Sequence, residues 1–318
     1  MALLGGSAAA WPVVARAQTS TAPVIGFLGF APASGNAGRI EALRAGLREF
    51  GYVEGSNLAI EFRWVENPDQ LRQFTADLVQ RQVAIIVTSG NVATVAAKSA
   101  TSSIPIIFSV ADDPVRLGLV ASFNKPGGNM TGVSLISGAL GPKRIALLRE
   151  LVPATNLFAM LVNPTNPAEA KQRDEQAAAS AIGQRILVLT ATEERDIETA
   201  FATLVSQHAG ALIINADSFF TAHRDKIIGL AAHYKIPAIY PWREYAEAGG
   251  LMSYGTSFAD SYRQLGVYVG RVLRGVKPTD LPVTQPTRIE LVINLTTAKA
   301  LGLEISSKLL ALSDAVVE

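Results

Sequence analysis

Residues 24–30 read VIGFLGF, a run of apolar side chains and glycines with no polar residue among them. A run of this kind is typical of a strand that is buried on both faces of a parallel sheet. Apolar residues at helical spacing follow at Ile40, Leu43 and Leu47. Gly51 then suits the end of that helix. The folded part of the chain is therefore predicted to begin with a buried strand and a helix that packs against it.

The same alternation of strand and helix continues along the chain. Residues 58–64 alternate apolar with polar side chains, which predicts a half-exposed strand at the edge of a sheet. Asn67-Pro68 and Asn166-Pro167 each predict the start of a helix, with the asparagine as its cap. Further buried strands are predicted at 83–87, 105–108, 157–162, 186–189, 211–214, 237–240 and 251–254, with helices between most of them.

Regular alternation of strands and helices predicts an α/β fold with parallel sheets and right-handed crossovers. The alternation runs twice, with joins near Val133 and Gly255, so we predict two doubly wound parallel-sheet lobes. The expected division is an export signal and leader at 1–22, a first lobe at 23–133 plus 256–283, and a second lobe at 134–255 plus 284–318.

Composition excludes several classes of protein. The chain has 318 residues, of which 49% are hydrophobic and 17% charged, and it has no cysteine. Its 28 basic and 27 acidic residues leave a net charge of +1, which excludes a generally basic nucleic-acid-binding protein. The lack of cysteine excludes disulfides, thiol catalysis and thiolate metal sites. The three histidines have no carboxylates arranged around them as for a metal, so we expect neither a metal nor a cofactor.

The N-terminus is predicted to be an export signal. Residues 1–17 carry no charge before Arg16 and end in Ala15-Arg16-Ala17, where small side chains suit signal peptidase. The run is too short, and too broken by glycine and proline, for a membrane-spanning helix. We expect export to the periplasm, with Gln18 first after cleavage. No basic segment precedes the apolar one, so two interpretations remain: a signal whose start codon is placed too late, and a frayed apolar N-terminus.

The position of a binding site follows from the fold class. In doubly wound sheets, ligands bind beyond the carboxyl ends of the strands. The residues that follow the predicted strands are mostly small, hydroxyl-bearing or acidic, a lining that can hold a small polar ligand by hydrogen bonds. The candidate ligand-binding residues are Ser34, Thr88, Ser89, Gly90, Asn91, Ser109, Asp113, Asn163, Asp217, Ser218 and Tyr254.

Several of these residues have two interpretations. Thr88-Ser89-Gly90 opens a predicted helix, whose unpaired N–H groups can bind an anion such as a carboxylate, but Ser89 can equally be a simple helix cap. Asp217 is placed either to cap a helix or to bind a ligand ammonium. Asp113 precedes a proline and is even more typical of a helix cap. Trp242 suits either a wall of the cleft or the core.

Nearly the whole chain, from about residue 23 to 305, resembles the periplasmic substrate-binding proteins of ABC transporters. Within them it is similar to the type I branch that includes tryptophan- and tyrosine-binding members. The motifs that carry this resemblance are IPIIF at 104–108 with DP at 113–114, PGGNMTG at 126–132, DSFF at 217–220, AGGLMSYG at 248–255, and INL at 293–295 with ALG at 300–302. The N-terminal residues also resemble the latter part of a twin-arginine export signal, without the two arginines.

The resemblance implies two lobes joined by three crossovers that close on a ligand. It further implies an exported, monomeric receptor that is not an enzyme and that delivers a small ligand to a membrane permease. The implied ligand is an amino acid, aromatic or not, or a related small carboxylate. Strand-end position and resemblance together assign Ser89 and Gly90 to the carboxylate and Asp217 or Asp113 to the ammonium. Asn163 and Tyr254 are expected to close from the second lobe.

Two other functions remain open on the sequence. A doubly wound enzyme acting on a small metabolite has the same fold class, but the chain lacks a phosphate-binding glycine loop and a serine nucleophile elbow. A receptor that feeds a chemotaxis or kinase partner uses the same ligand trap, so the sequence does not separate it from a transport receptor.

Overall fold

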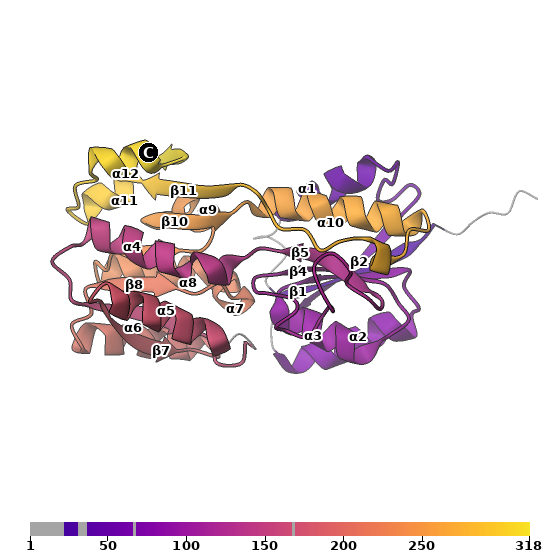
Figure 1. The fold of residues 1–318 in the computed structure, drawn as a ribbon, viewed down its shortest axis with the longest axis horizontal. Coiled ribbons are helices and arrows are strands. Elements are labelled where there is room, and N and C mark those ends of the chain that lie inside the picture. Colours follow the sequence, from indigo (N-terminus) through magenta and orange to yellow (C-terminus); the bar gives the residue numbers. More distant parts are fainter. Residues whose placement is uncertain (1–21, 31–36, 66–67, 167–168) are drawn as a thin grey trace, which may run out of the picture.

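The computed structural model describes residues 22–30, 37–65, 68–166 and 169–318. These form two α/β lobes side by side, each built on one sheet (Figure 1). The predicted fold class of two doubly wound, mainly parallel lobes is confirmed. Residues 1–21, which hold almost all of the predicted export signal, lie outside the described residues. Among the residues described, no helix is both long and apolar enough to cross a membrane.

The first lobe has a five-stranded, fully parallel sheet. Its strand order is β2 (Ala59–Val65), β1 (Val24–Phe30), β3 (Ile85–Ser89), β4 (Ile106–Val110) and β5 (Met130–Ser134). The half-exposed β2 lies at the edge, as its alternating sequence predicts, and the VIGFLGF strand lies inside the sheet and is almost fully buried.

Helices cover both faces of this sheet because its inner strands are apolar on both sides. Ile25 and Phe27 of β1 pack in one core cluster with α1 (Ala37–Arg48) and α10 (Phe258–Leu273). Leu28 points the other way and packs in a second cluster with α2 (Pro68–Gln80) and α3 (Asn91–Ala100).

The second lobe has a seven-stranded sheet in which one pair is antiparallel. Its order is β12 (Ala315–Val317), β11 (Ile289–Asn294), β10 (Met252–Thr256), β9 (Ala238–Tyr240), β8 (Ala211–Ile214), β6 (Leu157–Val162) and β7 (Arg185–Thr190). The antiparallel neighbours are β10 and β11. Sequence alternation did not predict β11, because the strand returns from a proline-spaced connection rather than from a helix.

Helices also cover both faces of the second sheet. One face carries α4 (Gly141–Leu151), α5 (Glu169–Ala181), α11 (Leu295–Ala300) and α12 (Ser307–Leu312). The other face carries α6 (Glu194–Ser206), α8 (Arg224–His233) and α9 (Arg243–Glu247). The short helix α7 (Ser218–Ala222) follows β8 and points toward the first lobe (Figure 1).

Helix α10 follows a strand of the second lobe but packs on the first. A Cβ built at Gly266 of α10 would lie 2.1 Å from the Leu43 carbonyl oxygen of α1, and one at Gly46 would lie 2.0 Å from the Arg263 carbonyl oxygen. The two helix backbones therefore touch at a pair of glycines. This contact anchors α10 on the first lobe, so the chain crosses between the lobes just before Phe258.

Three connections join the lobes: 135–136 after β5, Ser257 after β10, and 281–288 before β11. The first and third lie side by side, since the Ser134 N–H donates to the Thr284 carbonyl at 2.9 Å and the Thr284 N–H donates to the Gly132 carbonyl at 3.0 Å. The Thr256 hydroxyl lies 3.4 Å from the Leu135 carbonyl oxygen, which brings the second connection beside the first.

Arg144 of α4 binds the start of the second lobe to β10. Its side chain is fully buried. Its Nε donates to the Tyr254 carbonyl at 2.8 Å, while its two terminal nitrogens donate to the carbonyl and the hydroxyl of Ser137 at 3.2 and 2.9 Å. Burial lowers the pKa of Arg144 to about 10, with the charges of Glu175 and Asp112 opposing the shift. The guanidinium therefore stays charged at neutral pH beside two of the three connections.

Candidate ligand-binding cleft

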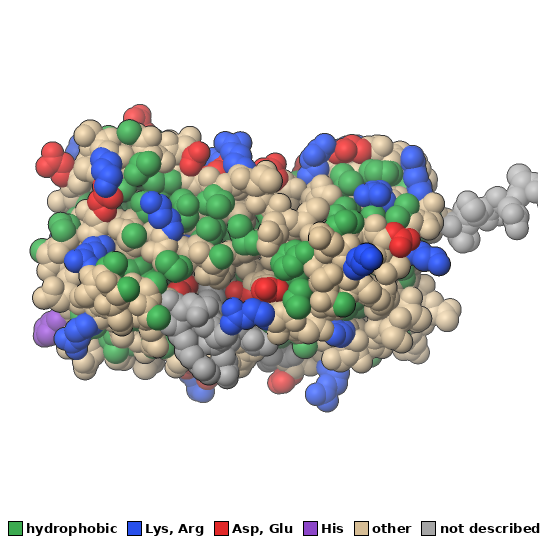
Figure 2. All heavy atoms as spheres, in the orientation of Figure 1, with side chains coloured by type: hydrophobic (Ala, Val, Ile, Leu, Met, Phe, Trp, Pro, Cys, Tyr) green, Lys and Arg blue, Asp and Glu red, His purple; other side chains and the backbone are tan. Residues whose placement is uncertain are grey.

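A cavity lies where the carboxyl ends of the strands of the two sheets face one another. Its empty space, open solvent at its mouth included, amounts to about 510 Å³. Figure 2 shows the two lobes in contact, with acidic and basic side chains gathered along a hollow between them. The lining residues are Phe30, Arg39, Ser89, Gly90, Asn91, Val92, Ser109, Ala111, Leu135, Asn166, Ala216, Asp217, Ser218, Thr221, Trp242 and Phe258.

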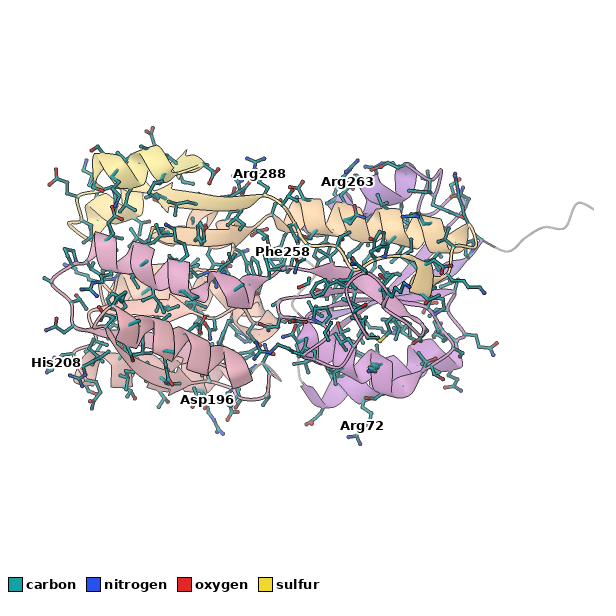
Figure 3. All side chains as sticks on the ribbon, in the orientation of Figure 1. Arg72, Asp196, His208, Phe258, Arg263 and Arg288 are labelled. Carbon is teal, nitrogen blue, oxygen red and sulfur yellow. The ribbon has the colours of Figure 1, made fainter. Side chains whose placement is uncertain are left out.

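Aromatic rings form one wall of the cavity. Trp242 follows β9 in the second lobe, and Phe258 is the first residue of α10, at the junction of the lobes (Figure 3). Their ring centroids lie 4.3 Å apart, at an interplanar angle of 43°. The guanidinium carbon of Arg39 lies 3.8 Å from the centroid of Phe258. Both interpretations of Trp242 hold, because the residue lines the cavity and is also part of the buried core, with only 2% of its surface exposed.

The loop between β3 and α3 brings the lobes into direct contact. Gly90 has φ +95° and ψ 157°, a conformation that is essentially restricted to glycine. Its N–H donates to the Ser109 carbonyl at 2.8 Å, within the first lobe. A Cβ built at Gly90 would lie 2.1 Å from the Ser218 hydroxyl oxygen, which belongs to the second lobe. The lobes therefore stand closed at this point, and a side chain at position 90 would require Ser218 to move.

A chain of side-chain hydrogen bonds crosses the cleft. Asn91 Nδ2 donates to Asp112 at 2.6 Å within the first lobe and to Asn166 Oδ1 at 2.9 Å in the second. Asn166 Nδ2 donates in turn to Asp217 Oδ2 at 2.8 Å. The carboxylates at the two ends only accept hydrogen bonds when ionised, so they set the orientation of both amides. We call these four residues the interlobe relay.

Asp217 combines the two roles that the sequence leaves open. It caps α7 by accepting a hydrogen bond from the Phe219 N–H at 2.8 Å, and it also lines the cavity. Its side chain accepts further hydrogen bonds from Asn163 at 3.2 Å and from Asn166. Burial raises the pKa of Asp217, and these hydrogen bonds oppose the shift. The cap is thus established, and the carboxylate still borders the cavity.

The structure places the predicted site residues in three groups. Ser89, Gly90, Asn91, Ser109, Asp217 and Ser218 line the cavity. Ser34 lies outside the described residues. Thr88, Asp113, Asn163 and Tyr254 are not among the lining residues.

The four residues away from the lining each have another position. Thr88 is fully buried, with its hydroxyl 2.8 Å from that of Thr94, because adjacent strand residues face opposite sides of a sheet. Asp113 accepts hydrogen bonds from the N–H groups of the two residues after Pro114, so it holds a turn. Asn163 stands behind Asp217 as a donor. The Tyr254 ring packs on the core of the second lobe.

Sequence reasoning missed Arg39, Asn166 and Phe258. The proline after Asn166 predicts that this residue is a helix cap, whereas its amide joins the interlobe relay. Arg39 lies in the first turn of α1, beyond the residues that directly follow β1. Phe258 begins the helix after β10 and lies four residues beyond Tyr254, the candidate that the strand-end position indicates.

The relay leads to a prediction about lobe separation. Asn166→Ala removes the hydrogen bond to Asn91 and thereby the polar contact between the lobes at this point. One net hydrogen bond is about 0.5–1.5 kcal/mol, so the balance between closed and open lobes should shift about twofold to tenfold toward open. Small-angle scattering should then give a larger radius of gyration. Asn163→Ala is the matched control, since Asn163 also donates to Asp217 but from within the same lobe; an equal expansion in both variants would contradict the prediction.

Comparison with known families identifies the family of this chain. The family model of the ABC transporter substrate binding proteins matches residues 34–317. The chain belongs to this family. A substrate-binding protein of this kind captures a small molecule for an ABC transporter, and the family is typically extracytoplasmic.

Individual relatives support the same placement of this substrate-binding protein. A tyrosine-binding protein of Clostridioides difficile is 27% identical over 260 residues, which cover 81% of this chain and 74% of the relative. A Streptococcus pneumoniae domain in complex with L-Trp shares 24% identity with a TM-score of 0.84. A ligand-free, open substrate-binding protein of Clostridium difficile shares 22% identity with a TM-score of 0.63. In both comparisons the matched region covers 93% of this chain and 99% of the other chain.

Proposed function

We propose that this substrate-binding protein is a periplasmic receptor that captures an amino acid between its lobes and delivers it to the permease of an ABC importer. One observation carries the choice of ligand: the closed cleft holds a cation, Arg39, and an anion, Asp217, beside an aromatic wall. A zwitterionic amino acid has one group for each charge. In this proposal the protein is a monomer and turns over no substrate.

The names of two relatives support this ligand class. One relative is a tyrosine-binding protein, and one similar structure holds L-Trp. Aromatic amino acids would also use the wall formed by Trp242 and Phe258, since offset or tilted ring pairs add to the binding of an apolar side chain.

Closure of the lobes supports the receptor mechanism. The TM-score with the L-Trp complex exceeds the one with the open, ligand-free protein, although sequence identity and coverage are nearly the same. The close approach of Gly90 and Ser218 and the interlobe relay also support a closed arrangement of the lobes. Three short connections between the lobes, containing small and turn-forming residues, suit a hinge.

The test is a thermal-shift screen of the twenty amino acids, followed by calorimetric titration of those that stabilise the protein. A ligand at 100 times its Kd should stabilise the protein by about 2.7 kcal/mol. Small-angle scattering with the same ligand should show a smaller radius of gyration. If none of the twenty amino acids binds, the proposed ligand class is overturned. If an amino acid binds without a decrease in the radius of gyration, only the closing mechanism is overturned.

A further inference from the structure

We propose that Arg39 binds the carboxylate of the ligand, in place of the Ser89–Gly90 loop, while Asp217 faces its ammonium from the opposite lobe. This inference rests on the proposed function, because it assumes an amino-acid ligand. It fixes the direction in which the ligand lies: the carboxylate toward the first lobe and the ammonium toward the second.

Arg39 is held in a position suited to this role. It lines the cavity from the first turn of α1, and only 8% of its surface is exposed. Its guanidinium carbon lies 3.8 Å from the centroid of the Phe258 ring, a cation–π contact that holds the charged group at the cavity. The N–H groups of a guanidinium form a planar fork that matches the geometry of a carboxylate.

The loop that the sequence favours for the carboxylate is already engaged. The N–H of Gly90 donates to the Ser109 carbonyl at 2.8 Å. The Ser89 hydroxyl lies 2.7 Å from the hydroxyl of Tyr262. The remaining groups of this loop lack a full charge, whereas Arg39 provides one, and hydrogen bonds with a charged donor are about twice as strong as neutral ones.

Glu244 of the second lobe is one charged neighbour of Arg39, and this pair gives the arginine an alternative role. Its Oε1 lies 4.0 Å from Arg39 Nε, which is an ion pair without a short hydrogen bond. If Arg39 served only to attract Glu244 across the cleft, its removal would weaken every ligand to the same degree. If it binds the carboxylate, its removal would weaken only ligands that have one. The two roles are therefore separable by the choice of ligand.

The experiment pairs protein variants with matched ligands. L-tyrosine and L-tryptophan are titrated calorimetrically beside tyramine and tryptamine, which lack the carboxylate. Arg39→Met should weaken binding of the amino acid about tenfold to a hundredfold and leave binding of the amine nearly unchanged. Arg39→Lys, which keeps the charge but loses the fork, should fall between Arg39→Met and the native protein.

Two controls keep the outcomes distinct. Glu244→Gln removes the ion pair but not the proposed carboxylate contact, so it should leave the ratio of amino-acid to amine affinity within about threefold of the native ratio. Melting temperatures of the unliganded variants report on folding. An equal loss for amino acid and amine in Arg39→Met, or full amino-acid binding by it, would overturn this inference. A native protein that binds none of the four ligands would instead count against the proposed aromatic amino acid.

Discussion

Arg144→Met should lower the free energy of unfolding by about 3–5 kcal/mol, the usual loss when one member of a buried charged group is removed. The variant keeps much of the volume of the side chain, although it is shorter, and it loses all three hydrogen bonds to Ser137 and Tyr254. It also removes a positive charge that acts on the fully buried carboxylate of Glu175. Urea unfolding followed by tryptophan fluorescence measures the change.

Two further variants separate charge from packing. Arg149→Met lies on the same helix at an exposed position and should change stability by no more than about 0.5 kcal/mol. Arg144→Met/Glu175→Gln removes both charges. The amide oxygen of the new glutamine can still accept the hydrogen bond that Asn215 donates to Glu175 in the native protein. We expect it to be more stable than Arg144→Met alone. Equal stability of the double and single variants would show that the lost hydrogen bonds and packing of Arg144, rather than the charge of Glu175, cause the effect.

Gly90→Ala should impair both folding and closure. At φ +95° and ψ 157°, a residue with a Cβ is strained by about 1–3 kcal/mol, which should appear as a lower stability of the unliganded protein. The new methyl group would also lie 2.1 Å from the Ser218 hydroxyl oxygen in the closed state. Overpacking of this kind typically costs about 1–3 kcal/mol, so the ligand affinity should fall about fivefold to 150-fold.

Ser218 provides the means to separate these two effects. Ser218→Ala removes the oxygen that the new methyl group would strike and leaves the Ser218 Cβ, at 3.3 Å, as the nearest atom. Gly90→Ala/Ser218→Ala should therefore recover part of the ligand affinity while keeping the reduced stability of Gly90→Ala. If the double variant binds no better than Gly90→Ala, the loss comes from backbone strain within the first lobe and not from a blocked closure.

The sequence alone determined the architecture and the place of the site. A strand that is apolar at every position, such as VIGFLGF, has to be covered on both faces, and only helices on both sides of a parallel sheet do this. The alternating residues of β2 likewise placed that strand at an edge. Because ligands bind at the carboxyl ends of such strands, the loop at 89–91 and the segment at 217–218 were predicted as candidates, and both line the cavity.

Only the tertiary structure decided which neighbouring side chain enters the cleft and what it meets there. Adjacent strand residues face opposite sides, so Ser89 lines the cavity while Thr88 is buried beneath α3. Asn166 carries the same Asn-Pro signal whether it caps a helix or bonds Asn91, 75 residues away along the chain. The position of Arg39 over Phe258 likewise depends on how α1 and α10 pack. Such contacts arise from the approach of distant segments, on which local propensity and spacing have no bearing.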